Sequence, residues 1–290
     1  MPSKTTRSAG DSRRPRLPET TFALSVKDAV TGATELLQRA GCETPRLDAE
    51  LLVAEALGVG RERLILDPER QIDEVGTLGG MVRRRCRREP IAYILGRKEF
   101  RHITLAVDSR VLIPRPETEL LVEVGVGLDR GARVVDVGTG SGAVALALKQ
   151  ERPDLEVWAT EVSADALAVS RENAQALGLE VEFVHGDLLA GVPARVDAVL
   201  ANLPYVASGT VLSPEISRFE PASALFAGPD GLDVIRRLVG QVAHVPLVGL
   251  EVGPDQAESV QKLLQDAGFS AVEVLPDLAG RARVVLARRT

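Results

Sequence analysis

The chain contains few of the residues that metal or redox chemistry requires. Its 290 residues include only two cysteines, Cys42 and Cys86, whose separation does not match a metal-binding spacing. We interpret both as reduced thiols of the protein core, as is typical of a cytoplasmic protein. Among the three histidines, His185 is expected to form only local hydrogen bonds, and the sequence suggests no partner for His102 or His244. The sequence therefore predicts neither a metal site nor histidine-based catalysis.

Long apolar runs are absent as well. No run approaches the about 20 residues that a helix needs to cross a bilayer. The segment from Met1 to Pro18 contains basic residues but lacks the apolar core of a signal peptide. We therefore expect a cytoplasmic protein without a membrane partner.

Positive charge is not in excess either. The formal net charge is −6 at pH 7, whereas extensive binding of nucleic acid depends on Lys and Arg side chains that neutralise phosphates. The sequence also lacks a Gly-x-x-x-x-Gly-Lys-Ser/Thr phosphate loop. Nucleic acid is therefore not expected as a direct substrate, although the net charge leaves local basic patches open.

The first third of the chain has a helical pattern. Residues 1–22 are expected to form a disordered tail. Apolar residues at helical spacing then predict helices over 26–40, 47–57 and 72–88, which together predict a small helical domain over residues 23–90.

The remainder of the chain has the pattern of an α/β protein. Alternating apolar residues predict a β-hairpin linker over residues 91–113, and residues 114–290 predict a doubly wound α/β sheet. Strands are expected over 133–137, 156–161, 181–185, 196–202, 246–252, 271–275 and 282–288. Helices are expected between most of them, for example over 143–150, 164–177, 232–242 and 254–267. Because the segment from Asp277 to Gly280 is too short for a crossover helix, the last two strands should pair antiparallel.

A glycine-rich turn follows the first strand of this sheet. It consists of Gly138, Thr139, Gly140, Ser141 and Gly142. Glycines at alternate positions let the backbone turn sharply and let a ligand approach without an intervening Cβ atom. We therefore expect a nucleotide-like cofactor here, although the third glycine comes one residue too early for the Gly-x-Gly-x-x-Gly fingerprint of dinucleotides.

Two acidic residues end the next two predicted strands. Glu161 lies about 20 residues beyond the start of the turn, where a carboxylate accepts both hydroxyls of a ribose. Asp187 follows the third strand, where it either reaches the amino group of an adenine or caps the next turn. Both residues extend the predicted cofactor site.

The tetrad Asn-Leu-Pro-Tyr, from Asn202 to Tyr205, directly follows the fourth strand. The Asn202 side-chain oxygen and the Leu203 carbonyl can each accept one N–H of a planar NH2 group, on which Tyr205 can stack. Such a nitrogen is a poor nucleophile because its lone pair is delocalised. The two hydrogen bonds direct the lone pair toward an electrophilic methyl, so that no strong base is needed to deprotonate the nitrogen first. The alternative is an Asx turn that merely ends the strand. Beside the cofactor motifs, the tetrad predicts methyl transfer to an amide or exocyclic nitrogen.

With these motifs the sequence resembles the release-factor glutamine N5-methyltransferases, a branch of the S-adenosylmethionine-dependent class I methyltransferases. The resemblance covers the chain from about residue 25 onward and extends to segments outside the cofactor motifs. These segments are Glu89 to Gly96, Glu99 with Phe100, Leu112 to Glu119, Glu220 with Pro221, Ala224 with Leu225, Asp230 to Asp233, and Asp277 to Arg281 followed by Val284 and Val285.

The resemblance implies a Rossmann-like, seven-stranded class I methyltransferase sheet over residues 114–290 and a substrate-recognition role for the helical domain. It also implies S-adenosyl-L-methionine as cofactor and, as methyl acceptor, the glutamine of the Gly-Gly-Gln loop of class I peptide chain release factors. The implied cofactor residues are Gly138, Thr139, Gly140, Ser141, Gly142, Glu161, Asp187, Leu188, Asn202 and Arg115. The implied glutamine-binding and catalytic residues are Asn202, Leu203, Pro204 and Tyr205. The region from Arg115 to Glu117 would close over the cofactor near its methyl group.

One position departs from the family pattern. The tetrad of the family is usually Asn-Pro-Pro-Tyr, and Leu203 replaces the first proline here. Leucine keeps the carbonyl that the grip uses, but it lacks the φ restriction of proline and adds an N–H that needs a partner. We therefore expect retained activity at a less preorganised site.

Two other functions compete with this interpretation. Similar tetrads occur in enzymes that methylate adenine N6 or guanine N2 in nucleic acid, which need a surface that follows the phosphates. The candidate surface is basic and comprises Arg83, Arg84, Arg85, Arg87, Arg88, Arg97, Lys98 and Arg101, whose alternative interpretation is a solvated helix end. The other competing function is a cofactor-binding relic without catalysis, which only Leu203 favours.

Overall fold

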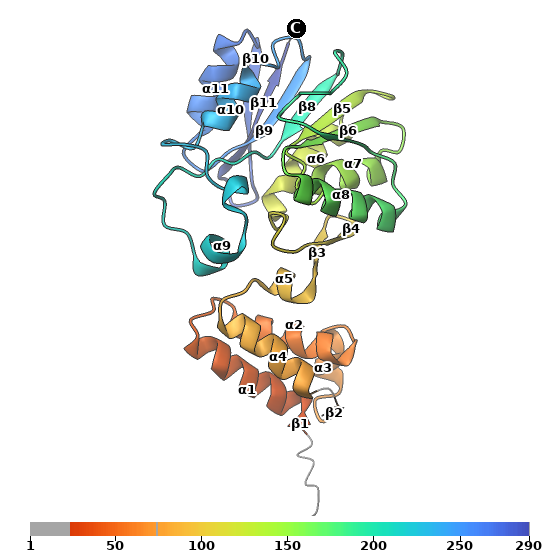
Figure 1. Cartoon of the computed structure of the whole chain (residues 1–290), viewed down its shortest axis with the longest axis vertical. Coiled ribbons are helices and arrows are strands. Elements are labelled where there is room, and N and C mark those ends of the chain that lie inside the picture. The colour runs from red at the N-terminus through yellow and green to blue at the C-terminus, as the bar shows by residue number, and fades with distance from the viewer. Residues whose placement is uncertain (1–23, 74, 290) are drawn as a thin grey trace, which may run out of the picture.

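The computed structural model describes residues 24–73 and 75–289. Its N-terminal part is a bundle of helices that lies apart from the sheet and is joined to it by a narrow connection (Figure 1). The bundle consists of α1 (Val26–Arg39), α2 (Pro45–Leu57), α3 (Glu62–Leu66) and α4 (Val75–Cys86), with a short antiparallel pair of strands, β1 (Leu24–Ser25) and β2 (Gln71–Ile72). The predicted disordered tail over 1–22 lies outside the described residues.

The sequence predicted where α1 begins and where α2 ends. The Ser25 hydroxyl accepts a hydrogen bond from the backbone N–H of Asp28 at 3.1 Å, which caps α1. Gly58 ends α2 in the left-handed conformation, with φ of 62°. The helix expected over 72–88 is shorter than predicted, because Ile72 pairs with Leu24 in the small sheet.

The connection to the sheet corrects one prediction. The expected β-hairpin over 91–113 begins instead with a short helix, α5 (Ile91–Leu95), and only β3 (Arg97–Phe100) and β4 (Ile103–Ala106) form the hairpin. Pro90 precedes the helix and Gly96 ends it with φ of 70°. Buried Tyr93 donates a hydrogen bond to the Val111 carbonyl at 2.5 Å, and this tertiary contact requires the helical turn. The boundaries at residues 90 and 113 remain predictions.

The second part contains the predicted doubly wound sheet of seven strands. The strand order is β10-β11-β9-β8-β5-β6-β7, with β11 antiparallel to both of its neighbours and the other pairings parallel. The strands are β5 (Arg133–Val137), β6 (Glu156–Glu161), β7 (Glu182–His185), β8 (Ala198–Ala201), β9 (Leu247–Glu251), β10 (Ala271–Pro276) and β11 (Ala282–Arg288). The class I methyltransferase fold that the sequence implied is therefore confirmed.

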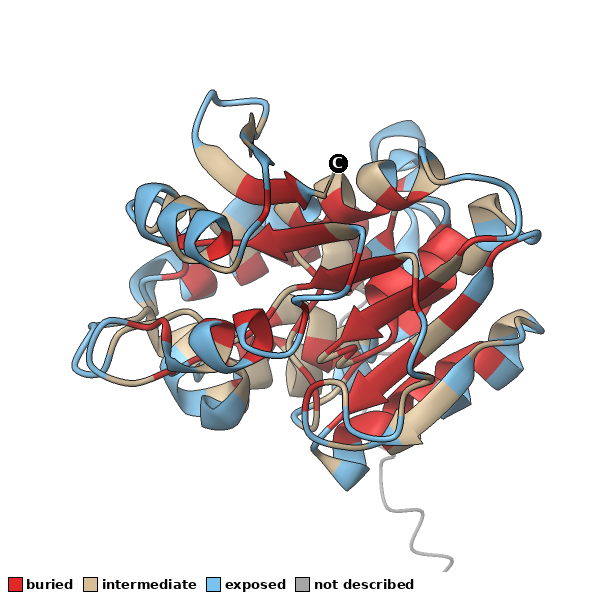
Figure 2. Cartoon of the chain, turned by 90° about the horizontal axis from the view of Figure 1, so that it is seen from above, coloured by how far each residue is buried: buried red, intermediate tan, exposed pale blue. Residues whose placement is uncertain are grey.

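Helices cover both faces of this sheet, so its central strands are buried on both sides (Figure 2). One face carries α6 (Glu119–Val126), α7 (Ala143–Glu151) and α8 (Ala164–Leu177). The other face carries α10 (Asp233–Val239) and α11 (Ala257–Asp266). Three short helices lie in connecting segments: η1 (Pro116–Thr118), α9 (Pro214–Phe219) and η2 (Ala222–Ala224).

The register of the sheet brings the functional candidates to one edge. Val137 at the end of β5 pairs with Thr160 of β6 and with Ala201 of β8, and Ala201 pairs with Leu250 of β9. The carboxyl ends of four parallel strands, β9, β8, β5 and β6, therefore lie side by side. From β5 the chain proceeds outward to β6 and β7 and then returns to β8 on the opposite side of β5, so the strand order reverses between β5 and β8. Open α/β sheets bind ligands at such switch points.

Candidate functional site

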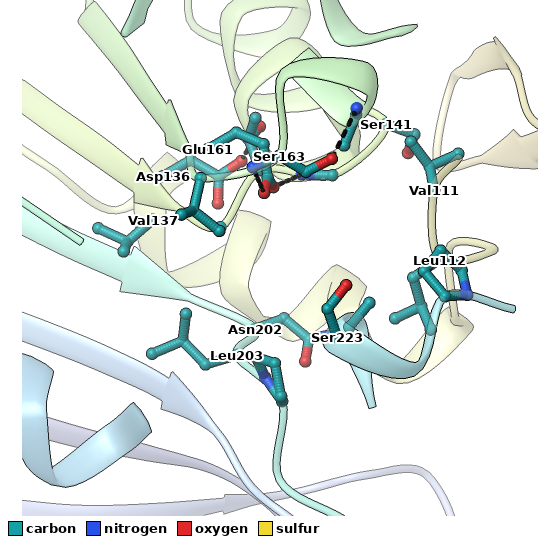
Figure 3. Close-up of a pocket in the computed structure, with 18 of the residues that line it drawn as sticks. Val111, Leu112, Asp136, Val137, Ser141, Glu161, Ser163, Asn202, Leu203 and Ser223 are labelled. Carbon is teal, nitrogen blue, oxygen red and sulfur yellow. Dashed lines mark hydrogen bonds between the residues drawn. The ribbon is translucent and has the colours of Figure 1, made fainter. Parts of the chain in front are cut away.

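A cavity of about 320 Å³ opens at this switch point. Such a volume lies within the range of about 300–1,000 Å³ that small-molecule sites have. In Figure 3, Glu161 and Asp136 lie on one wall, Asn202 and Leu203 face them from the opposite wall, and Leu112 lies to the side. Every predicted cofactor residue except Gly142 lines this cavity.

The glycine turn forms the floor of the cavity between β5 and α7. Gly138, Gly140 and Gly142 all have positive φ, at 73°, 56° and 88°. A Cβ atom on Gly138 would lie 3.0 Å from Leu203 Cδ2, which shows how closely the turn packs against the tetrad. A Cβ atom on Gly140 would meet no atom within 4 Å and would project into open space. The turn therefore leaves room for a ligand to lie against its backbone.

Glu161 is held rigidly at the end of β6. Its Oε2 accepts the Gly140 N–H at 3.0 Å and its Oε1 accepts the Ser163 N–H at 2.9 Å. Its exposed fraction is only 9%. Because each carboxylate oxygen can accept more than one hydrogen bond, both oxygens still have a free acceptor direction. The carboxylate is thus fixed in place and able to accept two hydroxyl groups.

Asp136 is a cavity residue that the sequence interpretation did not select. Burial raises its pKa to about 6, although hydrogen bonds from the Thr139 hydroxyl and the Ala145 N–H act in the opposite direction. The carboxylate fixes the glycine turn to the start of α7. Its place within the buried run of β5 was the only signal in the sequence.

Asp187 and Leu188 form the far rim of the cavity. Asp187 makes an ion pair with Arg237 of α10, and both side chains are about half exposed. Leu188 is buried and has φ of 55°, a left-handed conformation that costs roughly 1–2 kcal/mol in a residue other than glycine. The strained turn places an apolar side chain and a carboxylate side by side at the rim.

The tetrad lies between this cavity and a second one. The second cavity has a volume of about 180 Å³ and is mostly apolar. Five residues line both cavities: Leu112, Arg115, Asn202, Leu203 and Ala224. Asn202 and Leu203 therefore stand where the two spaces meet.

Each member of the tetrad is held differently. The Asn202 side chain donates a hydrogen bond from Nδ2 to the Thr118 hydroxyl at 3.0 Å. Leu203 is buried in the core, while Pro204 and Tyr205 are half-buried. Burial raises the pKa of Tyr205 to about 12, so its phenol stays protonated at neutral pH. Tyr205 lines the second cavity.

Arg115 is positioned by a buried carboxylate. It makes an ion pair with Glu220, whose other oxygen accepts the Ile113 N–H at 3.1 Å. The pair ties the segment before η1 to the segment after α9. Arg115 thus lines both cavities from an anchored position.

Part of the arginine cluster is not free to form the basic surface that one alternative requires. Arg85 is buried and binds both Asp48 and Glu215, at 2.7 Å and 3.0 Å. Arg88 binds the same Glu215 at 2.5 Å, and Arg84 binds Glu89 at 2.6 Å. Three of the five arginines on α4 and its C-terminal end are thus engaged within the protein. Arg85 and Arg88 connect the helical bundle to α9, so the interpretation as a solvated helix end is wrong for these two residues.

The sequence interpretation did not select Thr118, which lines the larger cavity, or Glu251, which ends the strand beside β8. Both side chains are buried, with exposed fractions of 4% and 1%. Glu251 ends β9, which pairs with β8 up to the residue before Asn202. An acidic residue at the carboxyl end of a buried strand was a signal in the sequence that could have identified Glu251.

In the part of the chain that the structure describes, no helix is long and apolar enough to cross a membrane. The described residues also contain no group of three or more His, Cys, Asp or Glu side chains able to hold a metal ion.

Two domain families match the chain. Residues 28–96 match the PrmC N-terminal domain, and residues 116–221 match the methyltransferase small domain. The catalytic domain of hMettl16, solved in complex with MAT2A 3′UTR hairpin 1, has a TM-score of 0.53 and 17% identity over 69% of this chain and 79% of that chain. At that identity the likeness concerns the fold alone.

Several relatives are similar to this chain over nearly their whole length. The release factor glutamine methyltransferase of Deinococcus radiodurans is 41% identical over 92% of this chain and 99% of its own. The protein of the same name from Mycolicibacterium smegmatis is 40% identical over 91% of this chain and 98% of its own. That of Caulobacter vibrioides is 38% identical over 91% and 96%. The chain therefore belongs to the release factor glutamine methyltransferase family of S-adenosylmethionine-dependent methyltransferases.

Proposed function

We propose that the protein transfers a methyl group from S-adenosyl-L-methionine to the side-chain amide nitrogen of the glutamine in the Gly-Gly-Gln loop of class I peptide chain release factors. The observation that carries this proposal is the position of Asn202 and Leu203 in the wall between two cavities. The larger cavity suits the cofactor, and the smaller one suits an acceptor side chain that enters from outside.

The residues of the larger cavity fit this cofactor. When bound, S-adenosyl-L-methionine supplies an electrophilic methyl on a sulfonium. We propose that Glu161 accepts the ribose hydroxyls with its two free acceptor directions. Asp187 and Leu188 would flank the adenine at the rim, and Arg115 would close the site near the junction. The remaining cofactor residues would be Gly138, Thr139, Gly140, Ser141, Gly142 and Asn202.

The tetrad would hold the acceptor amide. We propose that Asn202 Oδ1 and the Leu203 carbonyl each accept one N–H of the glutamine, which directs the nitrogen lone pair toward the larger cavity. Tyr205 and Pro204 would enclose the planar amide from the side of the smaller cavity. No side chain has to act as a strong base, because the nitrogen becomes far more acidic once it has bonded to the methyl and then releases a proton.

The discriminating experiment uses a labelled methyl donor and a purified class I release factor. The protein is expected to label the release factor and to leave unlabelled a variant in which the glutamine of the Gly-Gly-Gln loop is alanine. Equal labelling of both would show that another residue is the acceptor. Labelling of RNA or DNA in place of the release factor would support the nucleic-acid alternative, which the engaged arginines Arg84, Arg85 and Arg88 disfavour.

Asn202→Ala separates an enzyme from a cofactor-binding relic. The clamp acts on the reacting nitrogen, so the variant is expected to lose turnover by about 100-fold while its cofactor affinity changes little. Parallel losses of turnover and cofactor affinity would indicate that Asn202 is mainly structural.

A further inference from the structure

The side-chain amide of Gln256 joins three backbone segments behind the tetrad. Gln256 lies directly before α11, and its Oε1 accepts the Gly253 N–H at 3.0 Å. Its Nε2 donates to the Tyr205 carbonyl at 2.8 Å and to the Asp230 carbonyl at 3.1 Å. Tyr205 belongs to the segment after β8, Asp230 to the segment before α10, and Gly253 to the segment after β9. One side chain therefore ties the segments that leave two neighbouring strands to the segment that leads into α10.

The three partners determine which way the Gln256 amide points. A backbone N–H can only donate and a carbonyl can only accept, so the amide oxygen must face Gly253 and the NH2 group must face the two carbonyls. The two hydrogens of the NH2 group serve one carbonyl each. The reversed amide would place its oxygen against two carbonyls and its NH2 group against an N–H, and all three hydrogen bonds would be lost. The backbone therefore selects one orientation of the amide.

Two glycines leave space for this contact. Gly231 has φ of 76°, and a Cβ atom there would lie 2.1 Å from the Tyr205 carbonyl oxygen and 2.8 Å from Gln256 Nε2. A Cβ atom on Gly253 would lie 3.0 Å from Gln256 Oε1 and 3.5 Å from Tyr205 Cδ2. Because Cβ atoms do not approach other atoms to 2.1 Å, a side chain at position 231 would displace the Tyr205 carbonyl. This carbonyl is thus enclosed between the Gln256 amide and Gly231.

The contact reaches the smaller cavity through Tyr205. Tyr205 is held at its carbonyl by Gln256, and the next residue, Val206, pairs with Phe226 in a single parallel bridge. Tyr205 and Val206 both line the smaller cavity, whereas Gln256 lines neither cavity. The Gln256 amide therefore acts from behind the cavity wall and does not itself face a ligand.

We propose that Gln256 is a positioning residue that holds the Tyr205 backbone, so that the aromatic ring stands in the wall of the smaller cavity where the acceptor amide binds. This inference rests on the proposed function, because it concerns how the acceptor side of the same site is built. Leu203 lacks the φ restriction of proline, so the backbone of this tetrad depends more on tertiary contacts of this kind.

The first test compares two variants of similar size at Gln256. Gln256→Met removes all three hydrogen bonds. Gln256→Glu keeps an oxygen for the Gly253 N–H but places its second oxygen against the two carbonyls. Because Tyr205 encloses the amide both before and during methyl transfer, the KM for the release factor is expected to rise about tenfold in Gln256→Met, with kcat lowered by less than about threefold. The KM of Gln256→Glu is expected to rise at least as much.

The affinity for S-adenosyl-L-methionine, measured by calorimetry, is expected to stay unchanged in both variants. A wild-type KM in both variants would overturn the proposal. A lower KM in Gln256→Glu than in Gln256→Met would also overturn it, because the contact with Gly253 would then outweigh the contact with Tyr205. A loss of cofactor affinity in proportion to the rise in KM would overturn it as well, because it would indicate a general loss of structure.

The second test acts on the Tyr205 carbonyl from its other side. Gly231→Ala places a Cβ atom against this carbonyl and is expected to raise the KM for the release factor as Gln256→Met does. Gly131→Ala is the matched control: Gly131 lies before β5 with a similar φ of 74°, and a Cβ atom there would meet no atom within 4 Å. Both exchanges strain a left-handed backbone, but only Gly231→Ala displaces Tyr205. Equal KM values in these two variants would overturn the proposal.

A measurement that needs no turnover separates this inference from the proposed function. Tyr93 and Tyr205 are the only tyrosines of the chain, so protein labelled with fluorotyrosine reports on two side chains in fluorine NMR, and Tyr205→Phe identifies their signals. The Tyr205 signal is expected to shift or broaden in Gln256→Met, while the Tyr93 signal stays in place. An unchanged Tyr205 signal would overturn the proposal. A changed Tyr205 signal, together with a wild-type protein that does not methylate a release factor, would support the restraint on Tyr205 and refute the proposed function.

Discussion

Glu215 connects the helical bundle to the wall of the smaller cavity. It lies on α9, where its carboxylate binds Arg85 at 3.0 Å and Arg88 through two bonds at 2.5 Å and 2.7 Å. The next residue, Ile216, lines the smaller cavity. Because α9 has no buried residue of its own, this ion pair is a principal restraint on its position. Glu215→Gln is therefore expected to destabilise the protein and to loosen the cavity wall.

The structure sets the size of the effect. Loss of one partner from a fully buried pair costs about 3–5 kcal/mol. Arg85 is only 6% exposed but keeps Asp48 as a partner, while Arg88 and Glu215 retain some contact with water. The loss should therefore be smaller, and we expect Glu215→Gln to lower the free energy of unfolding by about 1–3 kcal/mol.

The effect should depend on pH in a defined direction. Burial acts to raise the pKa of Glu215, but hydrogen bonds from Arg88 and Arg85 outweigh it, so the pKa lies below the ordinary value of 4.5. A lowered carboxyl pKa stabilises the folded state above the unfolded-state pKa, and this stabilisation disappears as the pH falls through the folded-state pKa. The difference between wild type and Glu215→Gln is therefore expected at pH 7 and should shrink below about pH 4.

Urea unfolding at pH 7 measures the loss, and steady-state methylation measures its consequence for the site. The KM for the release factor is expected to rise, while the affinity for S-adenosyl-L-methionine stays unchanged. Glu55→Gln is the control, because its pair with Arg97 is exposed and worth about 0–1 kcal/mol. If Glu215→Gln is no less stable than Glu55→Gln, the ion pair does not restrain α9 and the reasoning fails.

Substitutions at three further positions have defined outcomes. The pKa of buried Asp136, raised to about 6, means that the folded state binds a proton more tightly than the unfolded state. The contribution of Asp136 to stability is therefore largest below about pH 4 and is lost as the pH rises through 6. Between pH 5 and pH 7, the unfolding free energy of Asp136→Asn, measured in urea, should rise relative to that of the wild type by roughly 1–3 kcal/mol. Leu203→Pro removes a buried side chain and should lower the unfolding free energy by about 1–3 kcal/mol without abolishing methylation; an equally stable variant would contradict the packing role of Leu203. Tyr205→Phe keeps the aromatic face and should retain most of kcat, whereas Tyr205→Ala should not; equal losses would show that the phenol and not the ring acts.

The fold was largely predictable because its signals are strong and local. Strands buried on both faces produce near-continuous apolar runs, so β6 and β11 begin and end at the predicted residues. The two short helices α5 and α9 were not predicted. Each has too few residues for a periodic pattern, and each is held by a distant contact: Tyr93 with Val111, and Glu215 with two arginines of the bundle.

Candidate residues could be recognised in the sequence where a short local motif contains them. Residues that come together only through the pairing of distant strands could not be recognised. The glycine turn and Glu161 follow adjacent strands, and their spacing alone suggests a shared ligand. Thr118 and Glu251 become neighbours of Asn202 only because β8 and β9 pair and η1 packs against their ends. The same reason explains why the partners of the arginines were missed. The arginines are clustered in the sequence and therefore suggested a basic surface, whereas Asp48 and Glu215 lie too far away in the sequence to be recognised as partners of Arg85.

Leu203 shows how packing can replace a covalent restraint. Proline would fix the backbone through its ring, whereas Leu203 inserts a side chain that is only 5% exposed into the core beneath the sheet edge. Its Cδ2 atom lies against Gly138, where a Cβ atom would approach it to 3.0 Å, closer than ordinary van der Waals contact. The glycine that opens the turn and the leucine whose carbonyl we propose as an acceptor of the substrate N–H are therefore in close contact. In this chain the two halves of the site are coupled directly through that contact, so a change at either residue should be felt at both.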